Sequence, residues 1–195
     1  MKVSRDGESC KNQGEQHMMN QETNVDKMKK TLENGIRDYK LFIDTCSLLF
    51  ESADAFWSNI IPILEKTKSN IIVPLRVYEE INKFVKNPDL CATKDSEGLH
   101  ERAIKAKETI VKLQKKGIVE VFGDKTDNFA DHVFISVFTN YMLTYNLMLI
   151  TQDKKLSQDI INIGKSRAVE RAKNIRVARI ANDGFLKLYY EPKST

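Results

Sequence analysis

Four carboxylates far apart in the sequence are the residues best suited to do chemistry together: Asp44, Glu80, Asp131 and Asp153. Each follows, directly or in the helix beyond it, a short apolar segment that is typical of a buried strand. If those strands run parallel, their carboxyl ends meet at one edge of a sheet, where the four acids would share a pocket. Acids without matching bases are costly to bury, but their oxygens suit a hard divalent cation. The pattern therefore predicts a site for a hard divalent cation.

Each acid also has an ordinary structural interpretation. Asp44 and Asp153 could cap the helices that follow them, and Glu80 taken alone would be a surface charge. Glu79 precedes Glu80, and because neighbouring residues on a helix point in different directions, only one of the two can face the other acids. We prefer Glu80, since it directly precedes the inward-facing Ile81.

The third acidic position and two hydroxyl groups complete the predicted site. Asp127 lies four residues before Asp131, so one of them could cap the helix there while the other binds metal. Asp131 is preferred because an apolar helical run surrounds it, which leaves Asp127 a supporting role. Thr45 and Thr151 follow the first and fourth predicted strands, and their hydroxyl groups could orient the carboxylates or hold metal-bound water.

The elements that must position these residues alternate between strands and helices. Strands are predicted at 40–44, 71–73, 118–122, 147–151 and 175–180, with a short edge strand at 185–190. Helices are predicted at 47–66 with a break or kink at Pro62, at 75–86, 99–116, 127–145 and 153–163, the last extending toward 172. This alternation predicts an α/β fold: a three-layer α/β/α sandwich around a mainly parallel sheet of four to five strands.

Composition limits the domain organisation and the cellular setting. Residues 1–36 contain no aromatic residue and balance six acids with six bases, so we predict a polar tail that is disordered or weakly helical, followed by one domain at 37–195. Cys10, Cys46 and Cys91 are too far apart for a zinc cluster or a disulfide framework. No apolar run reaches the roughly 18 residues of a membrane span, so a cytoplasmic protein without a membrane partner is expected.

The stretches that carry the acids resemble the four motifs of PIN-domain proteins, in that family's order and spacing, over about residues 38–182. They are Phe-Ile-Asp44-Thr-Cys-Ser-Leu-Leu, Val-Pro-Leu-Arg-Val-Tyr-Glu-Glu80-Ile, Ala-Asp131-His-Val-Phe-Ile and Leu-Ile-Thr151-Gln-Asp-Lys-Lys-Leu. One position departs from the family, whose asparagine after the first Asp-Thr is Cys46 here.

The resemblance implies a PIN-like fold and a metal-dependent ribonuclease. Asp44, Glu80, Asp131 and Asp153 match the family's metal-binding acids, and Thr151 matches its hydroxyl group. The implied activity is endonucleolytic hydrolysis of single-stranded or structured RNA with Mg²⁺ or Mn²⁺. A toxin paired with an antitoxin protein, an RNA processor of housekeeping or mobile elements, and a homodimer are all compatible with it.

RNA would also need cations, because an acidic site repels phosphates. Lys165, Arg167, Arg171 and Arg176 are predicted to contact phosphates beside the acids, with a solvated surface as the alternative. The main competing function is a non-catalytic PIN-like RNA-binding or scaffold protein. A nucleotide-binding fold is disfavoured, since neither Gly-x-Gly-x-x-Gly nor a P-loop occurs, and a dehalogenase-type phosphatase would need an acid where Cys46 stands.

Overall fold

The computed structural model describes residues 33, 35–91, 98–123, 130–165 and 173–189. The chain divides into two units, Met1–Gly35 and Ile36–Thr195, and the fold reported below belongs to the second. Most of the predicted N-terminal tail lies outside the described residues.

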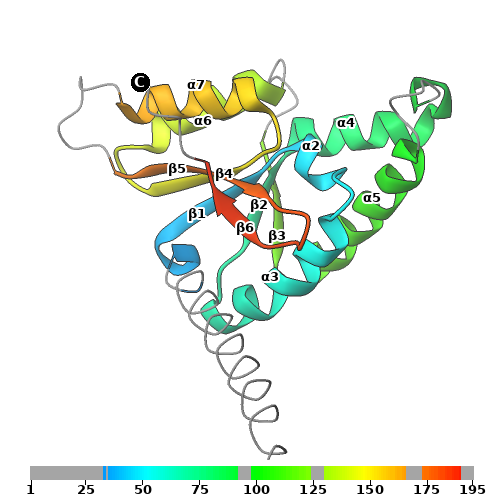
Figure 1. Ribbon diagram of the computed structural model, residues 1–195, viewed down its shortest axis with the longest axis horizontal. Helices are drawn as coiled ribbons and strands as arrows, with labels where there is room; N and C mark the ends of the chain where they lie inside the picture. Colours follow the sequence, from blue (N-terminus) through cyan, green and yellow to red (C-terminus); the bar gives the residue numbers. More distant parts are fainter. Residues whose placement is uncertain (1–32, 34, 92–97, 124–129, 166–172, 190–195) are drawn as a thin grey trace, which may run out of the picture. The chain divides into compact units, whose positions relative to one another are not determined.

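One six-stranded sheet organises the domain (Figure 1). Its strands are β1 (Tyr39–Ile43), β2 (Ile71–Pro74), β3 (Val119–Phe122), β4 (Asn146–Ile150), β5 (Ile175–Ile180) and β6 (Leu186–Leu188). They lie in the order β3-β2-β1-β4-β5-β6, parallel except for β6, which pairs antiparallel with β5. The predicted α/β class with a mainly parallel sheet is confirmed, and β6, at the place of the predicted edge strand, brings the sheet to six strands, slightly more than the four to five expected.

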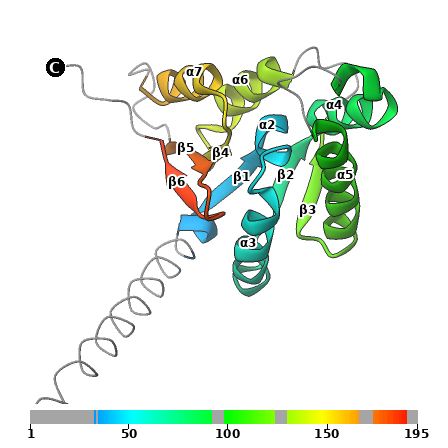
Figure 2. The same cartoon turned by 45° about the vertical axis from the view of Figure 1, so that its right-hand side comes forward.

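Helices cover both faces of the sheet. The described helices are α2 (Thr45–Leu48), α3 (Ala53–Thr67), α4 (Leu75–Lys86), α5 (Leu99–Lys115), α6 (Ala130–Tyr141) and α7 (Lys154–Lys165), with the 3-10 turn η1 (Pro88–Cys91) after α4. The chain passes from β1 to β2 and β3 on one side, and then to β4 and β5 on the other side of β1. Because the crossovers are right-handed, α3 and α5 lie on one face of the sheet and α6 and α7 on the other. Figures 1 and 2 show these two groups on opposite sides of the strands, which agrees with a three-layer sandwich.

The central strands are apolar on both faces, as a covered parallel sheet requires. In β1, Leu41, Phe42 and Ile43 are all buried, and β4 is buried from Leu147 to Ile150. Helix α4 packs against β2, β3 and α5, and its Val77 and Ile81 are each 0% exposed. Burying an aliphatic side chain of this size contributes about 1.5–3 kcal/mol, so the helix that carries Glu80 is firmly held.

The predicted helix at 47–66 is wrong in where it is interrupted. The chain breaks between α2 and α3, and Pro62 lies within α3. Pro62 and Ser58 are both exposed, so the carbonyl that loses its helical hydrogen bond at Pro62 can bind water instead. The break is fixed by a segment that is distant in the sequence, because Ser52 Oγ donates to the carbonyl of Asn182 at 3.0 Å.

Candidate metal centre

The predicted site lies where the topology of the sheet changes direction. From β1 the chain passes to β2 and β3 on one side, whereas β4 and β5 lie on the other. In open parallel sheets, the carboxyl ends of two such central strands diverge into a crevice that commonly holds a ligand. Asp44 directly follows β1, and its backbone N–H donates to the carbonyl of Ile150, the last residue of β4, at 3.1 Å.

Asp44 is a buried carboxylate with neutral partners. It is 6% exposed, and its Oδ2 accepts hydrogen bonds from Thr151 Oγ1 and from Cys46 Sγ, each at 2.7 Å. Its side chain does not cap α2, so the ordinary capping interpretation does not apply. Among the described residues no Lys, Arg or His side chain pairs with it. A buried carboxylate that lacks a counter-charge is costly, and a bound cation would remove that cost.

The Thr151 hydroxyl links the ends of two elements. Thr151 is 1% exposed, and its Oγ1 accepts the backbone N–H of Asp153 at 3.0 Å while donating to Asp44. With both roles filled, its rotamer is fixed and so is the orientation of the Asp44 carboxylate. This is the orienting role that the sequence predicts for Thr151.

Asp153 is exposed and begins α7. Its Oδ1 accepts the backbone N–H of Leu156 at 2.9 Å, as in a helix N-cap. One oxygen of Asp153 therefore caps the helix, and the second oxygen of the same carboxylate stays available as a ligand.

Glu80 and Glu79 have different partners. Thr45 Oγ1 donates to Glu80 Oε2 at 2.6 Å, which brings the α4 carboxylate next to the end of β1. Glu79 Oε2 instead accepts from Arg76 Nη1 at 2.7 Å within the same helix. Glu80, and not Glu79, is thus hydrogen-bonded to the residue that directly follows Asp44, and its role as a metal ligand stays a prediction.

Cys46 is the member of this cluster that sequence reasoning left out of the site. Its Sγ donates to Asp44, lies 3.4 Å from Thr151 Oγ1 and accepts the backbone N–H of Gln152 at 3.2 Å. Burial, and then the neighbouring charge of Asp44, raise the pKa of the thiol to about 12. Cys46 is therefore a neutral donor to Asp44. The feature of the sequence that could have identified Cys46 as part of this cluster was its position directly after Asp44 and Thr45.

The fourth acid is described only in its backbone. Asp131 is the second residue of α6, and α6 packs against α4, the helix that carries Glu80. Nothing is described of its side chain, and Asp127 lies outside the described residues. Whether Asp131 joins the other acids stays a prediction.

The donor atoms have the chemistry that Mg²⁺ and Mn²⁺ prefer. Asp44, Glu80 and Asp153 offer carboxylate oxygens. Thr151 donates a hydrogen bond to Asp44, and Thr45 donates one to Glu80. Within the part of the chain that the structure describes, no three His, Cys, Asp or Glu side chains already form a metal-sized group. The fully buried Ser47 Oγ, three residues after Asp44, finds no hydrogen-bond partner among the described residues. The site thus offers suitable ligands that a cation would have to draw together.

The described cations that were predicted to contact phosphates lie away from the strand ends that carry the acids. Arg176 stands at the amino end of β5, with its guanidinium carbon 5.7 Å from the centroid of the Tyr39 ring. Through Met148 of β4, Arg176 is level with Leu41 of β1, three residues before Asp44, which is about 10 Å along the strands at 3.3 Å per residue. Lys165 ends α7, about 18 Å from where that 12-residue helix starts beside Asp153. Lys165 and Arg176 thus do not stand at the strand ends that carry the acids, and their contact with RNA stays a prediction. Arg167 and Arg171 lie outside the described residues.

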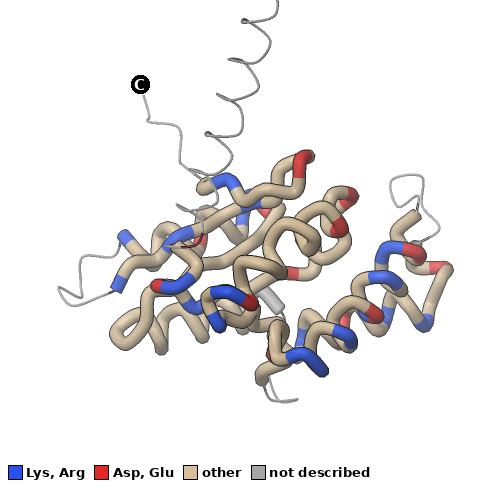
Figure 3. The backbone as a smooth tube through the Cα atoms, turned by 90° about the horizontal axis from the view of Figure 1, so that it is seen from below, with Lys and Arg blue, Asp and Glu red and all other residues tan. Residues whose placement is uncertain are grey.

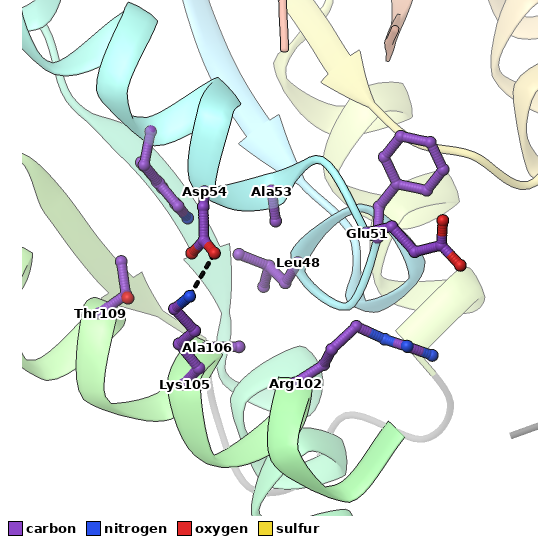
Figure 4. A pocket seen from close by; sticks show the side chains of 10 residues that line it. Leu48, Glu51, Ala53, Asp54, Arg102, Lys105, Ala106 and Thr109 are labelled. Atoms are coloured by element: carbon purple, nitrogen blue, oxygen red, sulfur yellow. Dashed lines mark hydrogen bonds and ion pairs between the residues drawn. The ribbon is translucent and has the colours of Figure 1, made fainter. Parts of the chain in front are cut away.

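A small cavity lies between the α2–α3 turn and α5. Figure 4 shows Arg102 and Lys105 projecting from α5 toward this turn, with Lys105 paired to Asp54. Its volume of about 40 Å³ has room for water but not for a nucleotide. Lys and Arg residues are interspersed with Asp and Glu over much of the described chain (Figure 3), although helix α5 carries five Lys or Arg residues and only two Glu.

Comparison with known proteins yields no assignment. No protein-family model matches the sequence, and a search of curated proteins finds no match either. The resemblance to PIN domains therefore stays a prediction carried by the motifs. Of the helices that the structure describes, none combines the length and apolar character needed to cross a membrane.

Proposed function

We propose that this protein is a metal-dependent endoribonuclease of the PIN-like type. The observation that supports it best is Asp44, a buried carboxylate at the carboxyl end of β1 whose described donors are a hydroxyl and a thiol. Thr151 links it to the start of α7, and Thr45 brings Glu80 beside it. The motif order adds Asp131 as the fourth acid.

Each residue has a stated role in the proposal. Asp44, Glu80, Asp131 and Asp153 would hold Mg²⁺ or Mn²⁺, and Thr45 and Thr151 keep the first two carboxylates oriented. When bound, such an ion supplies an activated water and neutralises charge on the phosphate. Cys46 stays protonated at neutral pH, because its pKa is about 12, so it acts as a donor and not as a nucleophile.

The direct test is cleavage of labelled single-stranded RNA with Mg²⁺ or Mn²⁺, with and without EDTA. We expect cleavage that EDTA abolishes, and a loss of at least 100-fold in Asp44→Asn, which keeps the size of the side chain while removing its charge. The matched control is Asp89→Asn, an exposed acid in η1, which should cleave like the parent.

Two results would contradict the proposal. Cleavage by Asp44→Asn at the parental rate would show that the central acid does no chemistry. RNA binding without any metal-dependent cleavage would favour the non-catalytic RNA-binding or scaffold alternative. The toxin, antitoxin and homodimer interpretations stay predictions from the resemblance.

A further inference from the structure

The edge of the sheet opposite the acids carries a second hollow, which we call the amino-edge pocket. It has a volume of about 330 Å³ and lies where β1 and β4 begin. The cations Arg37, Lys40 and Lys68 and the aromatic residues Tyr39 and Tyr145 line it. This volume is at the lower end of the range for small-ligand sites, about eight times that of the cavity beside α5.

The charge of the pocket favours an anion. Among its described lining residues, the three cations face a single carboxylate, Asp38. Arg176 adds a fourth positive charge beside it, over Tyr39. The cations Arg37, Lys40, Lys68 and Arg176 are all exposed, so their charges are accessible to a ligand.

Aromatic rings alternate with these cations. Lys40 Nζ lies 5.6 Å from the centroid of the Tyr145 ring, which is 42% exposed. Tyr141, 40% exposed, lies next to it with ring centroids 6.3 Å apart. Proteins that bind single-stranded nucleic acid combine such cations, which contact phosphates, with aromatic faces on which bases stack.

The polar groups beneath the pocket hold it in shape. Asn146 Nδ2 donates to the carbonyl of Asp38 at 3.1 Å, and its Oδ1 accepts the backbone N–H of Asn174 at 3.0 Å. One side chain thus fixes the segments that lead into Tyr39 and toward Arg176. A surface that is ordered before binding loses less entropy when a ligand arrives.

We propose that the amino-edge pocket binds single-stranded RNA, with the cations on phosphates and the tyrosine rings on bases. The proposal deepens the proposed function by making this RNA an extension of the strand cut at Asp44. The two sites are five residues of β1 apart, about 16 Å along the strand, which corresponds to about five nucleotides of a stacked RNA strand at 3.4 Å each.

The test measures binding of a fluorescent single-stranded RNA to the Asp44→Asn protein, so that cleavage plays no part. Lys40→Gln/Lys68→Gln should weaken binding about tenfold and reduce the slope of log affinity against log salt by about 1.4, or 0.7 for each phosphate contact. Tyr145→Leu should weaken binding and leave that slope unchanged. The control Lys83→Gln/Lys86→Gln removes two exposed lysines from α4 and should bind like its parent.

The possible failures can be told apart. Equal losses of RNA affinity in the pocket and control variants would show that binding depends only on the overall positive charge of the protein, and would overturn this inference. Displacement of the RNA by polyglutamate as effectively as by unlabelled RNA would overturn it in favour of an acidic protein partner. If the pocket variants weaken binding but the unsubstituted protein cleaves no RNA, the pocket stands and the proposed nuclease function fails.

Discussion

At the scale of single residues, neighbouring acids on one helix give the sharpest comparison. Glu80 accepts from Thr45 at the proposed metal site, whereas Glu79 pairs with Arg76 on the surface of α4. We expect Glu80→Gln to lower metal-dependent RNA cleavage at least tenfold and Glu79→Gln to change it less than twofold, because the surface pair contributes about 1 kcal/mol or less. Initial cleavage rates at saturating Mn²⁺ measure both. Equal losses in the two variants would contradict the assignment of Glu80.

Cys46 gives a prediction about pH. Its pKa is raised from 9.0 to about 12, so its thiolate fraction at pH 8 should be about a thousandfold below that of an ordinary cysteine. In a Cys10→Ser/Cys91→Ser background, the rate of alkylation of the native protein should keep rising tenfold per pH unit through pH 10. The urea-unfolded chain should instead level off near pH 9. A native rate that also levels off there would contradict the raised pKa.

The same raised pKa has a consequence for stability. Between about pH 9 and 12 the native state holds the Cys46 proton that the unfolded chain releases. The contribution of this group to the free energy of unfolding is therefore complete below pH 9 and falls as the pH rises toward 12.

Residue types at strand ends could be predicted from the sequence, but not their distant partners. Thr45 and Thr151 were expected near the acids because each directly follows a strand. The contact of Cys46 with the backbone N–H of Gln152, 106 residues away, depends on β1 and β4 being neighbours. The position of Arg176 could have been read from the sequence, since it is the second residue of the strand predicted at 175–180, whereas the acids were expected at the carboxyl ends of the strands.

At the scale of elements, the β5–β6 turn gives a stability prediction. Gly184 has φ +77°, and a Cβ there would come within 2.5 Å of the Ala55 backbone at the start of α3. Gly184→Ala should lower the free energy of unfolding by about 2 kcal/mol or more, through both the left-handed backbone and the clash. Urea denaturation measures this.

Gly117 supplies the matched control for that measurement. It has φ +72°, but a Cβ there meets no atom within 4 Å. Gly117→Ala should therefore cost only the backbone strain, about 1 kcal/mol. If the two glycine variants were equally destabilised, the close packing of the turn on α3 would contribute nothing.

Local signals set the helix boundaries well where the chain itself ends a helix. Pro74 and Asn87-Pro88 bracket α4, and it spans Leu75–Lys86 as predicted. The start of α3 had no such signal. It is set by Ser52 binding Asn182 and by the Gly184 turn, contacts with chain about 130 residues away.

At the scale of the whole molecule, the proposed metal should stabilise the fold. A ligand that binds only the native state at 100 times its Kd adds about 2.7 kcal/mol, which raises the melting temperature by about 5–10 °C in a chain of this size. We expect Mn²⁺ to produce such a rise in the parent protein and in Asp89→Asn. In Asp44→Asn the rise should be largely lost. Thermal melting with and without EDTA measures this independently of any activity.

The fold class followed from alternating strand and helix patterns, whereas the strand order did not. Apolar runs such as Leu147–Ile150 indicate buried parallel strands, but they are equally compatible with several orders. The observed order puts β1 beside β4 and so brings the chain after Ile43 next to the chain after Ile150. The metal site was predicted on the assumption that the ends of such strands lie side by side, and the observed strand order places the ends of β1 and β4 in this way.

The two outermost strands limit how this domain can associate with itself. β3 and β6 have only four and three residues, and their outward positions include the exposed charges Glu120 and Lys187. Short strands with charged side chains are poor templates for recruiting another chain. Copies of this domain should therefore resist joining into a continuous intermolecular sheet, and a homodimer, if one forms, would have to pack helix against helix.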